Sequence, residues 1–179
     1  MSVVAIAKRY AHALLIEAKK TQSEDVLLKD FALINAAISH SADLRMLLRS
    51  PIIESWRKKN VIREIFNSTV SELMLKFLLL VVDKRREQFI PEIATAFSEL
   101  VDTERNITRV GVTSAHEIDA DSQASLTKVL SSRTKSTVEA TYKTDSSLLG
   151  GVTVTVGDTV IDGSLRHRLQ ELKHRLANN

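Results

Sequence analysis

Residues 97–112 read FSELVDTERNITRVGV, and the spacing of the apolar side chains changes within this stretch. In its first part they recur at every third or fourth position, which is typical of one face of a helix. In its second part Val110 and Val112 alternate with polar neighbours, which is typical of a strand. The change predicts a helical domain over residues 1–105 and a domain that contains strands over residues 106–179.

The helical pattern extends back from this stretch to the N-terminus. It divides into six apolar stretches with short connections, at residues 4–18, 27–38, 43–48, 56–66, 70–84 and 91–105. Two pairs, Thr21 with Glu24 and Thr69 with Glu72, have the spacing of a capping box, in which the first side chain caps a new helix. We therefore expect a bundle of six helices, two of which begin at these threonines.

The second domain is predicted to run strand, helix, strand, strand, short strand, helix. Asp119 or Asp121 can cap the first of these helices, and Gly157-Asp158 is a tight hairpin signal. Asp162-Gly163-Ser164 is expected to cap the last helix. The apolar face of that helix carries Leu165, Leu169, Leu172 and Leu176. The fold class is thus α+β: an N-terminal six-helix bundle, then a small α+β domain with an open sheet and a C-terminal helix.

Composition and charge exclude several classes of protein. The chain has no cysteine, which excludes disulfides, thiolate metal sites and cysteine nucleophiles. Aromatic residues make up 4%, too few for the stacking platforms that bind single-stranded nucleic acid. The 25 basic and 22 acidic residues give a net charge of only +3, spread over both domains, so we expect no nucleic-acid partner. The N-terminus lacks the features of a signal peptide, and the longest apolar run is about half a membrane span, so we expect an intracellular protein.

Motifs for catalysis or cofactor binding are weak. Gly150-Gly151 and Gly157 lack the Lys-Ser/Thr of a phosphate loop, so a strand start and a turn are their expected roles. His167, Glu171 and His174 share one helical face at the spacing of metal ligands, but basic neighbours would oppose a cation. We therefore predict no catalytic residue, no cofactor and no metal.

One cluster of basic residues suggests a phosphate-binding patch. It comprises Arg45, Arg49, Arg57, Lys58 and Lys59. Acidic residues are interleaved with them, which favours a solvated face.

The remaining features are apolar. The first helix has two apolar stripes where a surface helix needs one, and the fifth is apolar nearly all round. Either both helices are central in the bundle, or they line a partly open groove for an amphipathic helix from a partner. The alanines of the first helix permit the close approach that such a groove needs. Surplus apolar surface without catalytic motifs indicates a binding protein.

The C-terminal motifs resemble those of a known family. LLGGVTVTVGD at residues 148–158, followed by VIDGS at residues 160–164, resembles the signature of the ATP synthase delta subunit family. That family includes the mitochondrial oligomycin-sensitivity-conferring protein. RYA at residues 9–11, LLRSPI at residues 47–52 and VTSA at residues 112–115 are similar to earlier family motifs, in the same order. The resemblance therefore spans nearly the whole chain.

This resemblance implies a non-catalytic stator subunit of the proton-translocating F-type ATP synthase. The subunit would lie at the cytoplasmic face of the bacterial inner membrane, which it would reach only through the complex. The bundle at residues 1–105 would hold the N-terminal helix of an alpha subunit, and residues 106–179 would bind the peripheral-stalk b subunits. The expected alpha-subunit contacts are Tyr10, Ala13, Leu14, Phe77 and Val81. The signature residues with an architectural role are Gly150, Gly151, Gly157, Asp162, Gly163 and Ser164.

Two other functions stay open at this point. One is a soluble helix-binding adaptor that uses the same groove and is unrelated to ATP synthase. The other is an enzyme of small phosphorylated substrates that uses Arg57, Lys58 and Lys59.

Overall fold

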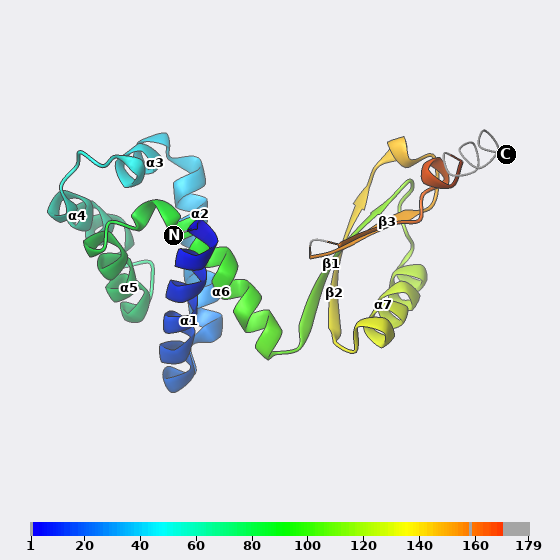
Figure 1. Cartoon of the computed structure of the whole chain (residues 1–179), viewed down its shortest axis with the longest axis horizontal. Coiled ribbons are helices and arrows are strands. Elements are labelled where there is room, and N and C mark those ends of the chain that lie inside the picture. The colour runs from blue at the N-terminus through cyan, green and yellow to red at the C-terminus, as the bar shows by residue number, and fades with distance from the viewer. Residues whose placement is uncertain (1, 158, 170–179) are drawn as a thin grey trace. The chain divides into compact units, whose positions relative to one another are not determined.

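The computed structural model describes residues 2–157 and 159–169. The chain divides into two compact units between Val101 and Asp102, a few residues before the change of apolar period. Helices make up the first unit and a sheet with a helix on it makes up the second (Figure 1). Over the described residues, no helix has the length and apolar character needed to cross a membrane.

The first unit confirms the predicted six helices. Their bounds are α1 Val3–Thr21, α2 Glu24–His40, α3 Ala42–Arg49, α4 Ser55–Phe66, α5 Glu72–Asp83 and α6 Ile90–Glu104, with a short 3₁₀ helix, η1 Glu87–Phe89, before α6. All six contribute to one core, because each turns its apolar stripe inward. The largest fully buried side chains of this core are Leu27, Ile34, Ile62, Met74, Leu78, Ile90, Ile93 and Phe97.

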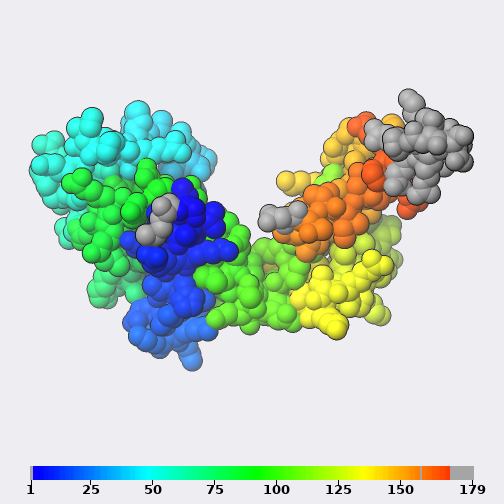
Figure 2. Space-filling model, in the orientation of Figure 1, coloured from blue at the N-terminus to red at the C-terminus, as the bar shows by residue number. Residues whose placement is uncertain are grey.

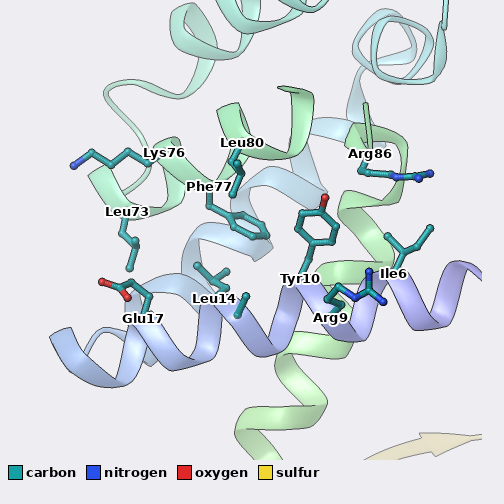
Figure 3. A pocket seen from close by; sticks show the side chains of 11 residues that line it. Ile6, Arg9, Tyr10, Leu14, Glu17, Leu73, Lys76, Phe77, Leu80 and Arg86 are labelled. Atoms are coloured by element: carbon teal, nitrogen blue, oxygen red, sulfur yellow. The ribbon is translucent and has the colours of Figure 1, made fainter. Parts of the chain in front are cut away.

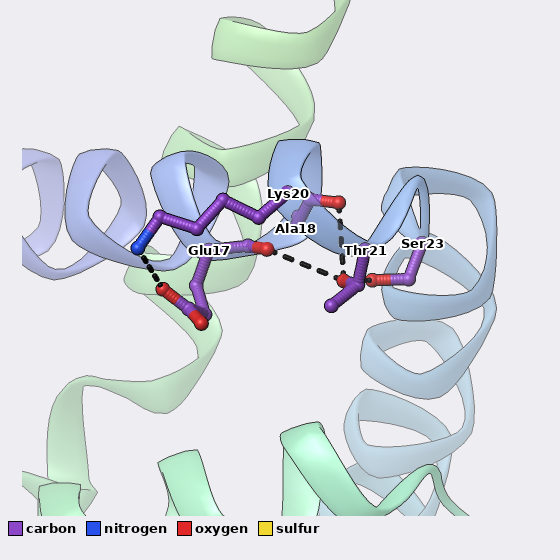
Figure 4. Close-up of polar contacts among 5 residues, drawn as sticks. All are labelled: Glu17, Ala18, Lys20, Thr21 and Ser23. Carbon is purple, nitrogen blue, oxygen red and sulfur yellow. Dashed lines mark hydrogen bonds and ion pairs between the residues drawn. The ribbon is translucent and has the colours of Figure 1, made fainter.

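The two predicted capping boxes are wrong, for the same physical reason in both places. Thr21 is the last residue of α1, and its hydroxyl donates to the carbonyls of Glu17 and Ala18, each at 3.2 Å (Figure 4). Thr69 likewise bonds back to the end of α4. The turn that reverses the chain takes up the next two residues, so the caps fall at Ser23 and Ser71 instead. Of these two, Ser71 accepts a backbone N–H, from Met74 at 3.3 Å.

The second unit confirms the predicted order of strands and helices. Its elements are β1 Ile107–Ser114, α7 Ala120–Thr134, β2 Thr137–Thr144, η2 Ser146–Leu148, β3 Val152–Val156 and β4 Thr159–Asp162, followed by helical residues 165–169. The sheet order is β2-β1-β3-β4, with β1 and β2 parallel and the other pairs antiparallel. Helix α7 makes the crossover between the parallel strands and packs Leu126 and Leu130 against the sheet.

The signature residues shape the turns around β3 and β4. Gly157 has φ +56 in the two-residue connection that joins the strands, as a tight hairpin requires. Gly151 has φ +81, and a Cβ at this position would lie 2.5 Å from the carbonyl oxygen of Gly163. The Asp162 carboxylate accepts the backbone N–H of Ser164 at 2.8 Å, and the Ser164 hydroxyl caps the following helix by accepting the N–H of His167. Leu172 and Leu176 lie outside the described residues.

Candidate helix-binding groove

A groove of about 510 Å³ lies between α1 and α5 in the first unit. Its apolar lining consists of Ile6, Tyr10, Ala13, Leu14, Leu73, Phe77 and Leu80. Its charged lining consists of Arg9, Glu17, Lys76 and Arg86. Figure 3 shows these side chains between the two helices, with the apolar ones along the middle. Such a lining suits an elongated apolar partner with polar flanks.

The sequence of α1 explains why this groove forms. Ala7, Ala11 and Ala18 are buried, so the inner face of α1 approaches the bundle closely. The adjacent face of α1 stays at the surface of the first unit, and Figure 2 shows much of this helix, in blue, exposed there. Ala13 lies on that exposed face, and its single methyl group leaves a hollow where a larger side chain would fill it.

Aromatic side chains make the floor of the groove rigid. Phe77 is buried and contacts Tyr10 edge to face, with ring centroids 6.4 Å apart. On its inner side Phe77 also contacts Phe31 edge to face, at 6.2 Å. Phe31 in turn packs on Phe97 at 5.4 Å. The groove is therefore anchored to the core by a chain of rings, and a partner would meet a preformed surface.

Four of the five predicted contact residues line this groove, namely Tyr10, Ala13, Leu14 and Phe77. The fifth, Val81, is 0% exposed in the core and does not line it. Leu80, which is 48% exposed, occupies the corresponding place. The lining positions of α5 have the spacing i, i+3, i+4 and i+7, and Lys76 among them marks the exposed face. Because a lysine is expected on the exposed side of a helix, Lys76 is the sequence signal that indicates Leu80, four positions further on, in place of Val81.

A buried carboxylate holds α5 in position, and sequence reasoning missed it. Asp30 of α2 is 5% exposed, and its Oδ2 accepts the backbone N–H of Ser71 at 3.0 Å and the Ser71 hydroxyl at 2.6 Å. The negative charge also lies at the N-terminus of α5, where the helix dipole stabilises it. Because these residues are 41 positions apart, no local pattern could have indicated the contact.

Three residues of the basic cluster have partners within the protein. Lys58 is buried and pairs with Glu87, and its ammonium group also donates to the carbonyl of Ser50 at 2.7 Å. Lys59 pairs with Asp83. The Arg57 guanidinium lies over the Trp56 ring, 5.2 Å from its centre. The predicted solvated face is therefore wrong for Lys58. Each of the three basic groups proposed to bind a phosphorylated substrate already contacts another side chain of the protein.

The predicted metal face lies only partly within the described residues. Within residues 2–157 and 159–169 no cluster of His, Asp and Glu side chains could hold a metal ion. His167 belongs to this range, but Glu171 and His174 lie outside it.

The second unit exposes apolar side chains around β4, an edge strand whose residues are all exposed. Val160 and Ile161 of β4 are 60% and 53% exposed. Leu149, Leu165 and Leu169 from the neighbouring segments are also exposed. These side chains lie on both faces of the edge, because neighbouring strand residues such as Val160 and Ile161 point to opposite sides of the sheet. The apolar surface around this edge and the groove give each unit a candidate binding site of its own.

Known proteins resemble this chain over almost its full length. The family model described as ATP synthase delta (OSCP) subunit matches residues 6–176. The ATP synthase subunit delta of Chlorobium phaeobacteroides is 37% identical over 178 residues, which are 99% of this chain and 98% of that protein. The subunit delta of Desulforamulus reducens is 40% identical over 172 residues, which are 96% of this chain and 95% of that protein.

The fold also matches a solved structure. A chain of the mitochondrial ATP synthase hexamer of Toxoplasma gondii superposes with a TM-score of 0.70 and 21% identity, covering 96% of this chain and 97% of that one. With the full-length relatives, this likeness agrees with the resemblance read from the signature residues. The chain belongs to the ATP synthase delta (OSCP) subunit family, and so to the non-catalytic stator components of the F-type ATP synthase.

Proposed function

We propose that this chain links two other subunits of the ATP synthase through two separate sites. The groove between α1 and α5 binds the amphipathic N-terminal helix of an alpha subunit. The apolar surface around β4 and the start of the C-terminal helix binds the ends of the b subunits. Within the complex, the chain lies at the cytoplasmic face of the bacterial inner membrane and meets that membrane only through its partners.

The single observation that carries the proposal is the shape of the groove. Its lining residues on α1 run from Ile6 to Glu17, which is a length of about 16 Å at 1.5 Å per residue, or about three helical turns. Its floor is apolar, and charged side chains stand at its ends. An amphipathic helix has the complementary form, an apolar stripe between polar flanks.

Linkage of this kind has a mechanical function. Torque on the rotor would turn the catalytic hexamer unless a stator holds the hexamer to the membrane sector. The subunit need not perform chemistry for this purpose. It needs two interfaces that stay bound under load, and a standard interface buries about 800 Å² on each partner. A rigid, preformed groove favours tight binding because little freedom is lost on docking.

The alpha-subunit site is tested by filling the groove. Ala13→Trp places a large ring in the hollow, and we expect it to weaken binding of a fluorescent alpha N-terminal peptide about a hundredfold. Fluorescence anisotropy gives the affinity, and a thermal melt shows that the bundle stays folded. The matched control is Ala36→Trp, because Ala36 is an exposed alanine of α2 outside the groove. Unchanged affinity in Ala13→Trp would place the alpha site elsewhere.

The b-subunit site is tested on β4. Ile161→Asp puts a charge into the exposed apolar surface at a side chain that is 53% exposed. We expect the soluble part of the b dimer to bind this variant at least about tenfold more weakly, by analytical ultracentrifugation. The control is Val129→Asp on α7, which is exposed to a similar degree, 51%. Equal b binding by the Ile161 variant and the wild type would exclude β4 from the site.

A further inference from the structure

The charges of the groove are distributed unevenly along it. Along α1 the charged lining residues are Arg9 and then Glu17, and along α5 they are Lys76 and then Arg86 after the helix ends. Figure 3 shows Arg9 and Arg86 at the end where Ile6 lies, and Glu17 and Lys76 at the other end. The two helices therefore run in opposite directions along the groove, and the two arginines share one end.

At the other end the charges are already balanced. Glu17 binds Lys20, with its Oε2 2.8 Å from the Lys20 Nζ. Lys76 binds Glu72, with its Nζ 2.6 Å from Glu72 Oε1. The second pair also keeps the pKa of Glu72 below its ordinary value, because the Glu72 carboxylate accepts a hydrogen bond from Lys76. A docked helix would find no uncompensated charge at this end.

The arginine end has no such compensation. The α1 sequence contains no acidic residue before Glu17, so Arg9 has no acidic neighbour on its own helix. The acidic residues nearest to Arg86 in the chain are Asp83 and Glu87, and lysines of α4 bind both of them. Among the residues that the structure describes, neither arginine has an ion pair. Arg86 is also half-buried, so a partner that covers it must supply a negative group.

We propose that Arg9 and Arg86 together bind a carboxylate of the docked helix and so fix the direction in which that helix lies. The inference rests on the function proposed for the groove. A guanidinium presents a planar fork of N–H donors that matches a carboxylate, and it keeps its charge when water is excluded. The preferred occupant is an amphipathic helix with an acidic side chain on the border of its apolar stripe, near one end.

Docking in the reverse direction is disfavoured at the arginine end. The acidic side chain of the partner would lie about 12 Å further along, beside Glu17, since Arg9 and Glu17 are eight positions apart at 1.5 Å per residue. The charges at that end are already paired, so the acidic side chain would gain no ion pair there, and the arginines would be covered without a partner. An ion pair that only one direction can form selects that direction.

Charge reversal in the full-length protein tests this inference. Arg9→Glu and Arg86→Glu are titrated with the fluorescent alpha N-terminal peptide at low salt, together with the milder Arg9→Gln and Arg86→Gln. We expect each Glu variant to bind about tenfold more weakly, the usual effect of losing one close interfacial charge pair. The control is Lys8→Glu, which changes the net charge equally but lies outside the groove, and its affinity should stay within about twofold of wild type.

The peptide supplies the second half of the test. Each of its acidic residues is changed to Lys in turn, and one of these peptides should recover affinity for both Arg9→Glu and Arg86→Glu. The position of that residue in the peptide then gives the direction of the bound helix. The inference is overturned if wild type binds the peptide but the arginine variants bind equally well, or if no peptide restores binding. If wild type does not bind at all, the function proposed for the groove falls, and this inference falls with it.

Discussion

The two units offer their partners different kinds of surface. In the helical unit the groove is concave, and Tyr10, Phe77 and Phe31 connect its floor to a large core. In the sheet unit the apolar residues lie on an edge strand, and among the described residues the buried core consists of Val110, Val112, Leu130, Val138 and Val154. A large core can hold a groove open without a ligand. A small core under an exposed apolar edge gains more from a partner, because binding adds to its buried surface.

The largest expected difference between the units is their stability as fragments. A fragment of residues 1–105, which keeps α6 whole, should fold alone and unfold cooperatively. A fragment of residues 106–179 should melt at a clearly lower temperature, because fewer apolar side chains are buried in it. Circular dichroism melts of both fragments measure this. A second fragment as stable as the first would remove the basis of the comparison.

The next largest effect concerns the Asp30 carboxylate in the helical unit. Asp30→Ala removes two hydrogen bonds to a buried charge and leaves the Ser71 N–H without its acceptor, which should cost about 3 kcal/mol of unfolding free energy. Asp30→Asn keeps an acceptor oxygen and should cost less. Urea denaturation gives both values. If Asp30→Ala unfolds at the same urea concentration as wild type, the carboxylate does not hold α5.

In the sheet unit, the substitutions that we compare with Asp30→Ala are at glycines. Gly151→Ala combines a left-handed φ with a Cβ 2.5 Å from the Gly163 oxygen, so it should cost about 3 kcal/mol. Gly157→Ala has a left-handed φ but no atom within 4 Å of the new Cβ, so it should cost only about 1 kcal/mol. Hydrogen exchange of the β3 and β4 amides in the full chain measures both. Equal costs would mean that the close contact at Gly151 relaxes freely.

The smallest effect is a difference in pH dependence. Asp119, Asp145 and Asp162 each accept a backbone N–H two or three residues further along the chain, and this bond lowers the pKa of each carboxyl. A lowered pKa gives stability that is present above the unfolded-state pKa, about 3.9 for Asp, and is lost as the pH falls through the folded-state value. All three residues are in the sheet unit, whereas in the described part of the helical unit the carboxyl of Glu72 has a lowered pKa.

The sheet unit should therefore lose stability sooner than the helical unit as the pH falls below about 4. Fluorescence of Trp56, the one tryptophan of the chain, follows the helical unit. Hydrogen exchange of the sheet amides follows the other unit. Asp162→Asn should flatten the acid response of the sheet unit, and an unchanged response would exclude this carboxyl as a cause.

Local patterns in the sequence predicted the elements, and distant contacts explain where the prediction failed. The change of period near Asn106, the hairpin at Gly157 and the Ser164 cap are each decided within a few residues, and the structure has them where they were expected. The threonine caps failed because two residues of chain are needed to reverse direction before the next helix begins. That requirement is geometric, and the pattern Thr-x-x-Glu does not contain it.

The groove was only partly predictable, because local patterns indicate the helices that form it but distant contacts decide how they pack. Apolar excess on two helices indicated which helices form it, but not which face of each stays open. Val81 and Leu80 differ by one position, which is a rotation of about 100° around a helix axis, and the position of Lys76 is the local signal that favours Leu80. Asp30 with Ser71, and Lys58 with Glu87, join residues far apart in the chain. Such pairs become visible only once the helices are assembled.

Proton pumping in rebuilt membranes tests most directly whether the chain is a two-ended link. Membranes stripped of the soluble headpiece are reassembled with headpiece subunits and with wild type, Ala13→Trp or Ile161→Asp as the full-length chain. ATP hydrolysis and ATP-driven proton uptake are measured together. The account predicts that either variant keeps hydrolysis but loses most of the pumping, because one end of the link is released. Full pumping by a variant that no longer binds its partner would contradict it.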